Sequence, residues 1–223
     1  MKQASRIIFY LYLAVVVLDL VFIYWFRDEW RWFTKPLLMP LLATGFLLRI
    51  QKPVKSNSLL ILSAIFFSWV GDILLQARDL FIPGLISFLL AHVFYIIYFL
   101  KSGGSKKGWV QKHPLYVFPV AIYILILLYF LFPYLGSLAI PVVIYSLTIG
   151  LMLLLAINSR SRVDRKASAL FTAGALSFVI SDSVLAIHLF ALNISLLGLI
   201  VMITYALAQW LIVKGALVQL ESE

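Results

Sequence analysis

Two aspartates lie deep inside apolar stretches of the sequence, each within a segment of the same pattern. Gly71–Leu75 and Ser181–Leu185 both consist of a small residue, an aspartate (Asp72 or Asp182), two further residues and a leucine. An ionised carboxylate inside a membrane costs about 2.5–3.5 kcal/mol on insertion scales, so such residues are rare and usually mark a proton pathway, a substrate site or a chemical step. Two carboxyls at one cavity suit general acid–base chemistry, because one can hold a proton while the other stays ionised. The alternative is that each is a structural carboxyl, hydrogen-bonded to Ser, Tyr or the N-terminus of a facing helix.

Lys35 is a cation at the predicted start of a short apolar helix, where Pro36 is suited to the first helical position. There it could bind a lipid phosphate or hold a carboxylate ionised. It could equally be an interfacial lysine whose side chain extends to the headgroups.

Other polar residues in the apolar segments are spaced to share a helix face. His92 and Tyr95 are three residues apart. His92 could orient an aspartate or relay a proton, although a single buried histidine more often serves as a hydrogen-bonding core residue. Tyr205 and Gln209 are one turn apart, and they either join two helices or line the same cavity. Asp19 has no matching motif; it lines the cavity or pairs with an Arg or Tyr, and its role stays open.

Composition places these residues in an integral membrane protein. Of the 223 residues, 64% are hydrophobic and only 12% are charged, about half the charged fraction of a soluble domain. The absence of cysteine excludes disulfides, thiolate metal sites and cysteine nucleophiles. With three histidines and no H-E-x-x-H, G-x-S-x-G or Gly-rich phosphate motif, we expect no metal, no other cofactor, and neither a serine hydrolase nor a nucleotide site. The net charge of +9 is typical of cytoplasmic loops beside anionic headgroups and does not indicate nucleic-acid binding.

We predict a single all-α transmembrane domain over residues 1–223, a bundle of eight membrane-spanning helices. The predicted spans are residues 7–26, 36–50, 58–77, 81–100, 114–133, 137–157, 167–190 and 193–213. The first is too long for the apolar core of a signal peptide, so we expect it to be retained. With the N-terminus in the cytoplasm, 14 of the 18 Lys and Arg residues fall on the cytoplasmic side, which favours an even number of spans with both termini cytoplasmic. The expected location is a bacterial inner membrane, or the endoplasmic reticulum membrane in a eukaryote.

This topology places both aspartates at one depth, towards the non-cytoplasmic side. Each follows the cytoplasmic start of its span by 14 or 15 residues, which is about 21–22 Å along a helix. An offset of 110 residues matches Asp72 with Asp182, Tyr95 with Tyr205 and Lys35 with Tyr145. It indicates a parallel 4+4 repeat that would set the aspartates opposite each other, although a few matches also arise by chance in so apolar a chain.

Polar and small residues recur in a fixed order from the second predicted span to the eighth. They are Lys35–Leu37, Ser68–Leu75, Gly84, Phe88, His92, Tyr95, Tyr145, Gly174, Ala175, Phe178, Ser181, Asp182, Leu185, Ala186, Tyr205 and Gln209. In this order and spacing the chain resembles the YhhN/TMEM86 family of multi-pass lysoplasmalogenases. The resemblance covers nearly the whole chain, but Asp19 is not part of the pattern.

The resemblance implies hydrolysis of the vinyl-ether bond of a lysoplasmalogen, giving a fatty aldehyde and glycerophosphocholine or glycerophosphoethanolamine. It implies that Asp72 and Asp182 share the acid and base roles, in an order that the sequence leaves open. Lys35 would bind the phosphate of the lysophospholipid, and an apolar channel would hold its chain. The residues expected to order water and headgroup are His92, Tyr95, Tyr205 and Gln209, and the further expected substrate-binding residues are Tyr145 and Ser181.

Two other function classes stay open. A proton-coupled transporter of small molecules or lipids is the main alternative, because an intramembrane aspartate pair across a parallel repeat also describes carriers. Few Gly or Pro interrupt the spans near the aspartates, so the broken helices of many carriers are not indicated. A catalytically silent membrane scaffold is the third interpretation.

Overall fold

The fold was analysed in a computed structural model of the chain. The structure describes residues 2–25, 27–50, 56–77, 79–192, 194 and 196–222. Lys52, Lys55 and Arg78, which enter the charge count, lie outside the described residues, as does Phe26 at the end of the first predicted span.

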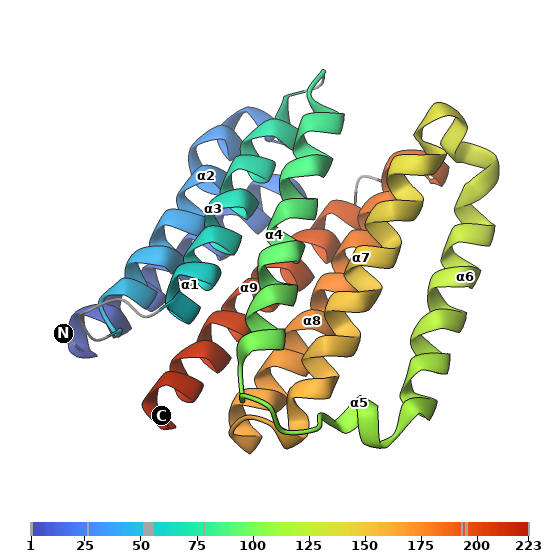
Figure 1. The fold of residues 1–223 in the computed structure, drawn as a ribbon. Helices are drawn as coiled ribbons and strands as arrows, with labels where there is room; N and C mark the ends of the chain where they lie inside the picture. Colours follow the sequence, from blue (N-terminus) through green and yellow to red (C-terminus); the bar gives the residue numbers. More distant parts are fainter. Residues whose placement is uncertain are drawn as a thin grey trace.

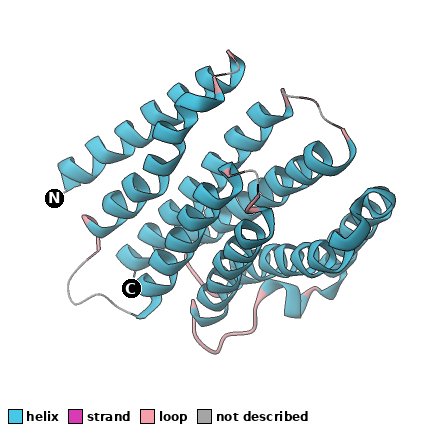
Figure 2. Cartoon of the chain, turned by 90° about the horizontal axis from the view of Figure 1, so that it is seen from above, coloured by secondary structure: helices cyan, strands magenta, loops and turns pink. Residues whose placement is uncertain are grey.

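Long helices make up nearly all of the described chain, and short loops join them (Figure 2). The nine α-helices in the described residues are α1 (Lys2–Tyr24), α2 (Asp28–Leu47), α3 (Ser56–Gln76), α4 (Phe81–Lys101), α5 (Trp109–Lys112), α6 (Val117–Leu135), α7 (Ala139–Asn158), α8 (Arg165–Ala186) and α9 (Leu197–Ser222). Four short 3-10 or π turns flank them, at Pro114–Tyr116, Gly136–Leu138, Ser159–Ser161 and Ile187–Ala191. Each of the α-helices except α5 is at least 19 residues long.

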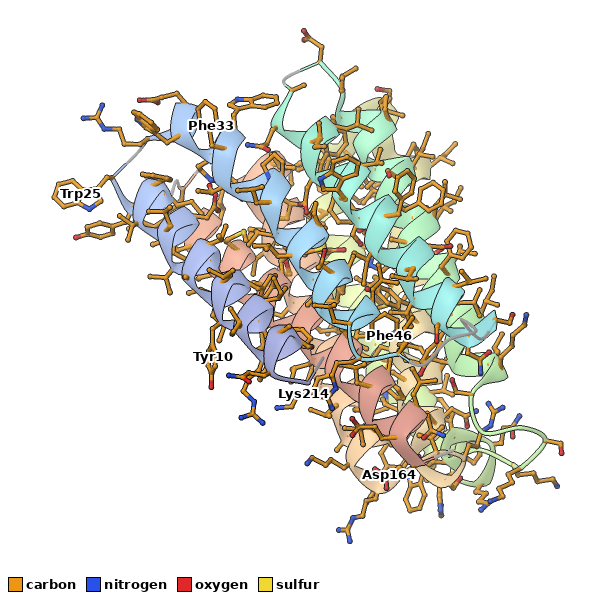
Figure 3. The ribbon with its side chains drawn as sticks, turned by 90° about the vertical axis from the view of Figure 1, so that its left-hand side faces the viewer. Tyr10, Trp25, Phe33, Phe46, Asp164 and Lys214 are labelled. Atoms are coloured by element: carbon orange, nitrogen blue, oxygen red, sulfur yellow. The ribbon has the colours of Figure 1, made fainter. Side chains whose placement is uncertain are left out.

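The eight long helices run alternately between two ends of a bundle, and both termini lie at the same end (Figure 1). We call the opposite end the distal end; it holds the connections α1–α2, α3–α4, α6–α7 and α8–α9. Trp25 and Phe33 lie there with exposed rings, whereas Asp164 and Lys214 lie towards the end of the termini (Figure 3). Exposed tryptophans at one end of an apolar bundle are typical of a membrane interface.

Within the part of the chain that the structure describes, six stretches are long and apolar enough to cross a membrane. One of them, Pro114–Ser161, contains both α6 and α7. Helix α2 is not among the six, because its first half carries acidic and basic residues. The structure therefore gives eight long helices in the predicted order, of which α2 is the most polar.

Close helix contacts in the centre of the bundle depend on small residues. A Cβ atom at Gly174 of α8 would lie 3.0 Å from the carbonyl oxygen of Ala208 in α9. A Cβ atom at Gly215 of α9 would lie 3.1 Å from the carbonyl oxygen of Ala167. The two glycines let the backbones of α8 and α9 meet directly, as small residues do between membrane helices. By contrast α6 stands at the edge of the bundle, where α7 is its main neighbour (Figure 1).

Two predicted helix boundaries are corrected by the structure. Helix α2 begins at Asp28, so Lys35 and Pro36 lie inside it and do not form its start. Helix α9 continues to Ser222, beyond the predicted end at residue 213, because Gly215, Ala216 and Gln219 are buried in the bundle. The last helix is therefore longer than its predicted span.

Candidate active site

Asp72 lies one turn before the distal end of α3, and 1% of its side chain is exposed. Lys35 of α2 places its Nζ atom 3.4 Å from Oδ1 of Asp72. The hydroxyl of Tyr205 in α9 donates a hydrogen bond of 2.6 Å to Oδ2. A buried carboxylate needs a counter-ion and hydrogen-bond donors, and both are present. Three helices therefore converge to stabilise Asp72 in its ionised form.

Two prolines and a tryptophan fix the helix that carries Lys35. Pro40 has no N–H group, so the carbonyl of Pro36 loses its partner within helix α2. The indole Nε1 of Trp69 in α3 donates a 2.8 Å hydrogen bond to that carbonyl. Because Lys35 is the neighbour of Pro36, this bond holds the lysine beside the helix that carries Asp72.

Gly71, next to Asp72, lets an aromatic ring of α4 approach the backbone of α3. A Cβ atom at this position would lie 2.6 Å from the ring of Phe88. Phe88 meets the ring of Tyr205 edge-on, with the ring centroids 5.8 Å apart. The small residue of the motif thus has a structural use, since it positions the ring that packs against the phenol bound to Asp72.

Asp182 lies in the last part of α8 in a different environment. Its side chain is 13% exposed, and Oδ2 accepts a 2.5 Å hydrogen bond from the hydroxyl of Tyr145 in α7. Nε2 of His92 in α4 lies 3.8 Å from the same oxygen. In the described part of the chain no Lys or Arg pairs with Asp182, so its neighbours are a phenol and an imidazole.

His92 is fully buried, and neither of its ring nitrogens has a hydrogen-bond partner among the described residues. Its ring is held edge-on by Tyr145, at 5.2 Å between centroids, and by Phe178, at 4.8 Å. Buried polar atoms are almost always hydrogen-bonded. Two unpaired ring nitrogens beside a carboxyl can therefore bind a water molecule or a substrate oxygen.

A second polar chain joins the helices around the two aspartates. Tyr95 of α4 donates a 2.6 Å hydrogen bond to Oε1 of Gln209 in α9. Nε2 of Gln209 in turn donates a 2.8 Å bond to Oγ of Ser68 in α3, one turn before Asp72. All three side chains are buried. The chain ties α4 and α9 to the helix of Asp72 and thereby fixes their relative positions.

The surroundings of the two aspartates form one cluster. The ring of Phe178 contacts both His92 and Tyr205, at centroid distances of 4.8 and 5.6 Å. His92 lies beside Asp182, and Tyr205 is hydrogen-bonded to Asp72. A polar cluster inside an apolar bundle, with two carboxyls in unlike environments, can hold one ionised acid and one proton donor.

The structure brings together most of the residues singled out in the sequence. The cluster contains Asp72, Asp182, Lys35, His92, Tyr95, Tyr145, Tyr205 and Gln209. Ser181 instead donates a 3.1 Å hydrogen bond to the carbonyl of Val201 and so joins α8 to α9. A part for Ser181 in substrate binding stays a prediction.

Sequence reasoning assigned no site role to several members of the polar network. Ser68 precedes Asp72 by four residues, so the shared helix face was a usable signal. Tyr12 of α1 donates a 2.8 Å hydrogen bond to the carbonyl of Ala206, and no spacing pointed to it. Asp19 pairs with Arg31 and Thr34, which confirms one of the two interpretations left open for it.

An apolar groove runs between α1 and α9 and encloses about 230 Å³. Its lining residues are Tyr12, Leu13, Val16, Leu20, Ile203, Ala206, Leu207 and Trp210. Ala206, which lines the groove, directly follows Tyr205, the hydrogen-bond donor to Asp72. The groove therefore adjoins the polar cluster along α9.

Two comparisons with known proteins give matches. The family model described as the YhhN family matches residues 30–216. The human protein named lysoplasmalogenase TMEM86B is 30% identical over 196 residues, which cover 86% of this chain and 78% of the human one. No solved structure matches the chain. The family match contains every residue of the polar cluster, and it begins after α1.

Proposed function

The chain belongs to the YhhN family, and from this premise we propose that it is a lysoplasmalogenase-like hydrolase of alkenyl lysophospholipids. It would cleave the vinyl-ether bond to release a fatty aldehyde and glycerophosphocholine or glycerophosphoethanolamine. The observation that carries the proposal is the pair of intramembrane carboxyls. One lies beside a lysine, whereas the described neighbours of the other are a phenol and an imidazole.

The reaction needs a proton donor, a group that stabilises a cation, and water. Protonation of the β-carbon of the vinyl ether breaks the C=C π bond and leaves an oxocarbenium ion on the carbon bonded to oxygen. Water adds to that carbon and loses a proton, giving a hemiacetal. The hemiacetal then collapses: its C–O bond to glycerol breaks, the glycerol oxygen takes a proton, and the aldehyde leaves. The proton given in the first step is returned, so acid–base catalysis suffices.

The unlike environments of the two aspartates support a division of labour. Lys35 and Tyr205 stabilise Asp72 as a carboxylate, and a fixed negative charge favours the oxocarbenium ion. Asp182 has no such cation among its described neighbours, so it is the better proton donor. Because Tyr145 engages Oδ2 of Asp182, the proton would be carried by Oδ1.

His92 is suited to orient the water that adds to the cation. Its nitrogens have no hydrogen-bond partner among the described residues, and Nε2 lies near Oδ2 of Asp182 at 3.8 Å, too far for a direct bond. A water held by His92 and Asp182 would satisfy both groups. Once Asp182 has given up its proton, its carboxylate can accept one from this water.

The two ends of the substrate have matching surroundings. The Lys35 side chain is partly exposed and carries a positive charge that suits the phosphate, while the buried Asp72 contacts it from within the bundle. The groove between α1 and α9 suits the alkenyl chain, because its lining is almost entirely apolar and adjoins the segment that carries Tyr205. Tyr95 and Gln209 would keep the helices of the site in register.

For the membrane arrangement we propose eight spans with both termini cytoplasmic, in a bacterial inner membrane. Both termini lie at one end of the bundle, together with the ends of the helices that the basic segments join (Figure 1). The 4+4 repeat is supported by the 110-residue offset, since Lys35 contacts Asp72 and its counterpart Tyr145 contacts Asp182. The aspartates then face the distal, non-cytoplasmic half of the membrane.

The test is aldehyde release by the purified protein from an alkenyl lysophospholipid in water enriched in ¹⁸O. We expect aldehyde to form, and the glycerophospho product to carry no ¹⁸O, because water adds to the alkenyl carbon. Label in the glycerol or phosphate oxygens would contradict the proposed bond cleavage. No aldehyde from any alkenyl lysolipid, together with proton-driven flux in liposomes, would replace the hydrolase with a transporter.

A further inference from the structure

Asp19 and Arg31 form a second, partly buried ion pair beside the proposed active site. We propose that Arg31 and Lys35 together bind the phosphate of the lysophospholipid, and that Asp19 is a positioning residue which holds Arg31 for this task. The inference rests on the proposed function, because it extends the substrate site that this function requires. It adds two residues to which the family resemblance assigns no role.

The geometry around Asp19 is that of a built site. Asp19 of α1 is fully buried, and its Oδ1 accepts a 2.6 Å hydrogen bond from Thr34. Arg31 of α2 directs Nη2 and Nε to Oδ2, at 3.3 and 3.4 Å. Two guanidinium nitrogens of Arg31 face Oδ2 of Asp19, and Thr34 holds Oδ1 of the same carboxylate. The buried carboxylate therefore fixes the orientation of the arginine.

Arg31 and Lys35 are four residues apart on α2, which makes them neighbours on one helix face, separated by about 6 Å along the axis. Each is the exposed member of its ion pair: the side chains of Arg31 and Lys35 are 21% and 16% exposed, whereas those of Asp19 and Asp72 are 0% and 1% exposed. A ligand that reaches this face meets N–H donors first. An anion with several oxygens, such as a phosphate ester, is the complementary ligand.

The position along the bundle fits a lipid headgroup. Arg31 lies one turn into α2 from the distal end, close in sequence to the exposed Trp30 and Phe33 of the interface. Lys35 lies one turn deeper and contacts Asp72. A phosphate between the two cations would direct the glycerol, and the ether at its first carbon, inward to the aspartates. A free anion would gain nothing from this alignment.

Binding measurements on the purified full-length chain in detergent test the site without any need for turnover. The probes are a non-cleavable alkyl-ether lysophosphocholine, the matching alkylglycerol without phosphate, and glycerophosphocholine without a chain. For Arg31→Gln we expect the affinity for the lysophosphocholine to fall about tenfold or more, as for loss of a charge-assisted contact, with the affinity for the alkylglycerol unchanged.

Arg27→Gln is the matched control. It removes the same charge from the same end of α2, but Arg27 pairs with Glu29 at the surface, where the two side chains are 63% and 64% exposed. We expect this variant to bind both lipids like the wild type. An equal loss of lysophosphocholine binding in Arg27→Gln would show a general surface-charge effect and overturn the proposal.

Asp19 is tested as a positioning residue by Asp19→Asn and, in case that variant fails to fold, by Thr34→Val. Both variants should lower the affinity for the lysophosphocholine and leave the affinity for the alkylglycerol unchanged. Arg31→Lys should bind the lysophosphocholine more tightly than Arg31→Gln does. An equal fall in affinity for both lipids would indicate a purely structural pair and contradict the proposal.

The outcomes separate this inference from the hydrolase itself. If the wild type releases no aldehyde but Arg31→Gln still loses phosphate selectivity, the binding site stands and the hydrolase proposal fails. If the wild type releases aldehyde and Arg31→Gln keeps full selectivity for the phosphate-bearing lipid, the hydrolase proposal stands and the binding-site proposal fails. If glycerophosphocholine binds as tightly as the lysophosphocholine, the site takes a free anion and the lipid assignment is wrong.

Discussion

Lys35 forms a 3.4 Å ion pair with Asp72 inside the helix bundle. The residue 110 positions later, Tyr145, makes the equivalent contact with the second aspartate, but as a neutral phenol. Two carboxyls in matching sequence motifs therefore have unlike partners, a cation for one and a hydroxyl for the other. This difference allows one to remain ionised while the other carries a proton.

Removal of the lysine should destabilise the protein. Lys35→Met leaves Asp72 as an uncompensated buried charge, at a cost of about 3–5 kcal/mol in the free energy of unfolding. The double variant Lys35→Met/Asp72→Asn should regain most of that loss and remain inactive. Denaturant unfolding in detergent, followed by tryptophan fluorescence, measures both. A single variant as stable as the wild type would show that the ion pair does not form.

The phenol bound to Asp182 should affect the chemical step. Tyr145→Phe removes one hydrogen bond to the carboxyl, and we expect kcat to fall about tenfold with little change in KM. Tyr123→Phe is the control, because Tyr123 donates a 2.8 Å bond to the neighbouring Ser183 and not to the aspartate. The measurement is the steady-state rate of aldehyde release. An equal loss of kcat in the two variants would contradict a specific role of Tyr145 in the chemical step.

The glycine before Asp72 should not tolerate a methyl group. In Gly71→Ala the added Cβ would lie 2.6 Å from the ring of Phe88, and we expect a loss of about 1–3 kcal/mol together with lower activity. Gly71→Ala/Phe88→Leu should recover stability, because the smaller side chain leaves room. Gly198→Ala, whose Cβ would be 3.5 Å from Ile23, serves as the control. Thermal unfolding in detergent is the readout, and a harmless Gly71→Ala would refute the packing argument.

The groove between α1 and α9 should set the preference for chain length. Leu207→Trp places an indole in the groove, so KM should rise for long-chain alkenyl lysolipids and change little for short-chain ones. Leu176→Trp enlarges an exposed leucine of α8 outside the groove and should leave both values unaltered. If Leu207→Trp left KM for long chains unchanged, the chain would have to bind elsewhere.

The long helices could be predicted from the sequence because a long apolar run crosses the membrane. There its backbone N–H and C=O groups find no water and must be hydrogen-bonded to each other within a helix. The start of α2 could not be predicted, because a proline such as Pro36 is typical of the first turn of a helix. Its position inside α2 is explained only by the hydrogen bond from Trp69 to the carbonyl of Pro36, which the structure shows. The pairing of Asp72 with Lys35 joins residues 37 positions apart on different helices, so helical periodicity carries no trace of it. The same is true of Asp19 and Arg31, although an aspartate and an arginine flanking one connection were a usable hint.

The central claim is that two intramembrane aspartates act together on the vinyl ether, and its most direct test compares aldehyde release by Asp72→Asn, Asp182→Asn and the wild type. The exposed Asp79→Asn makes the same chemical change outside the site and is the control. We predict that each site variant folds and loses at least about 100-fold in kcat, the usual contribution of a general acid or a fixed stabilising charge, while Asp79→Asn keeps full activity. Full activity in either Asp72→Asn or Asp182→Asn would contradict the account.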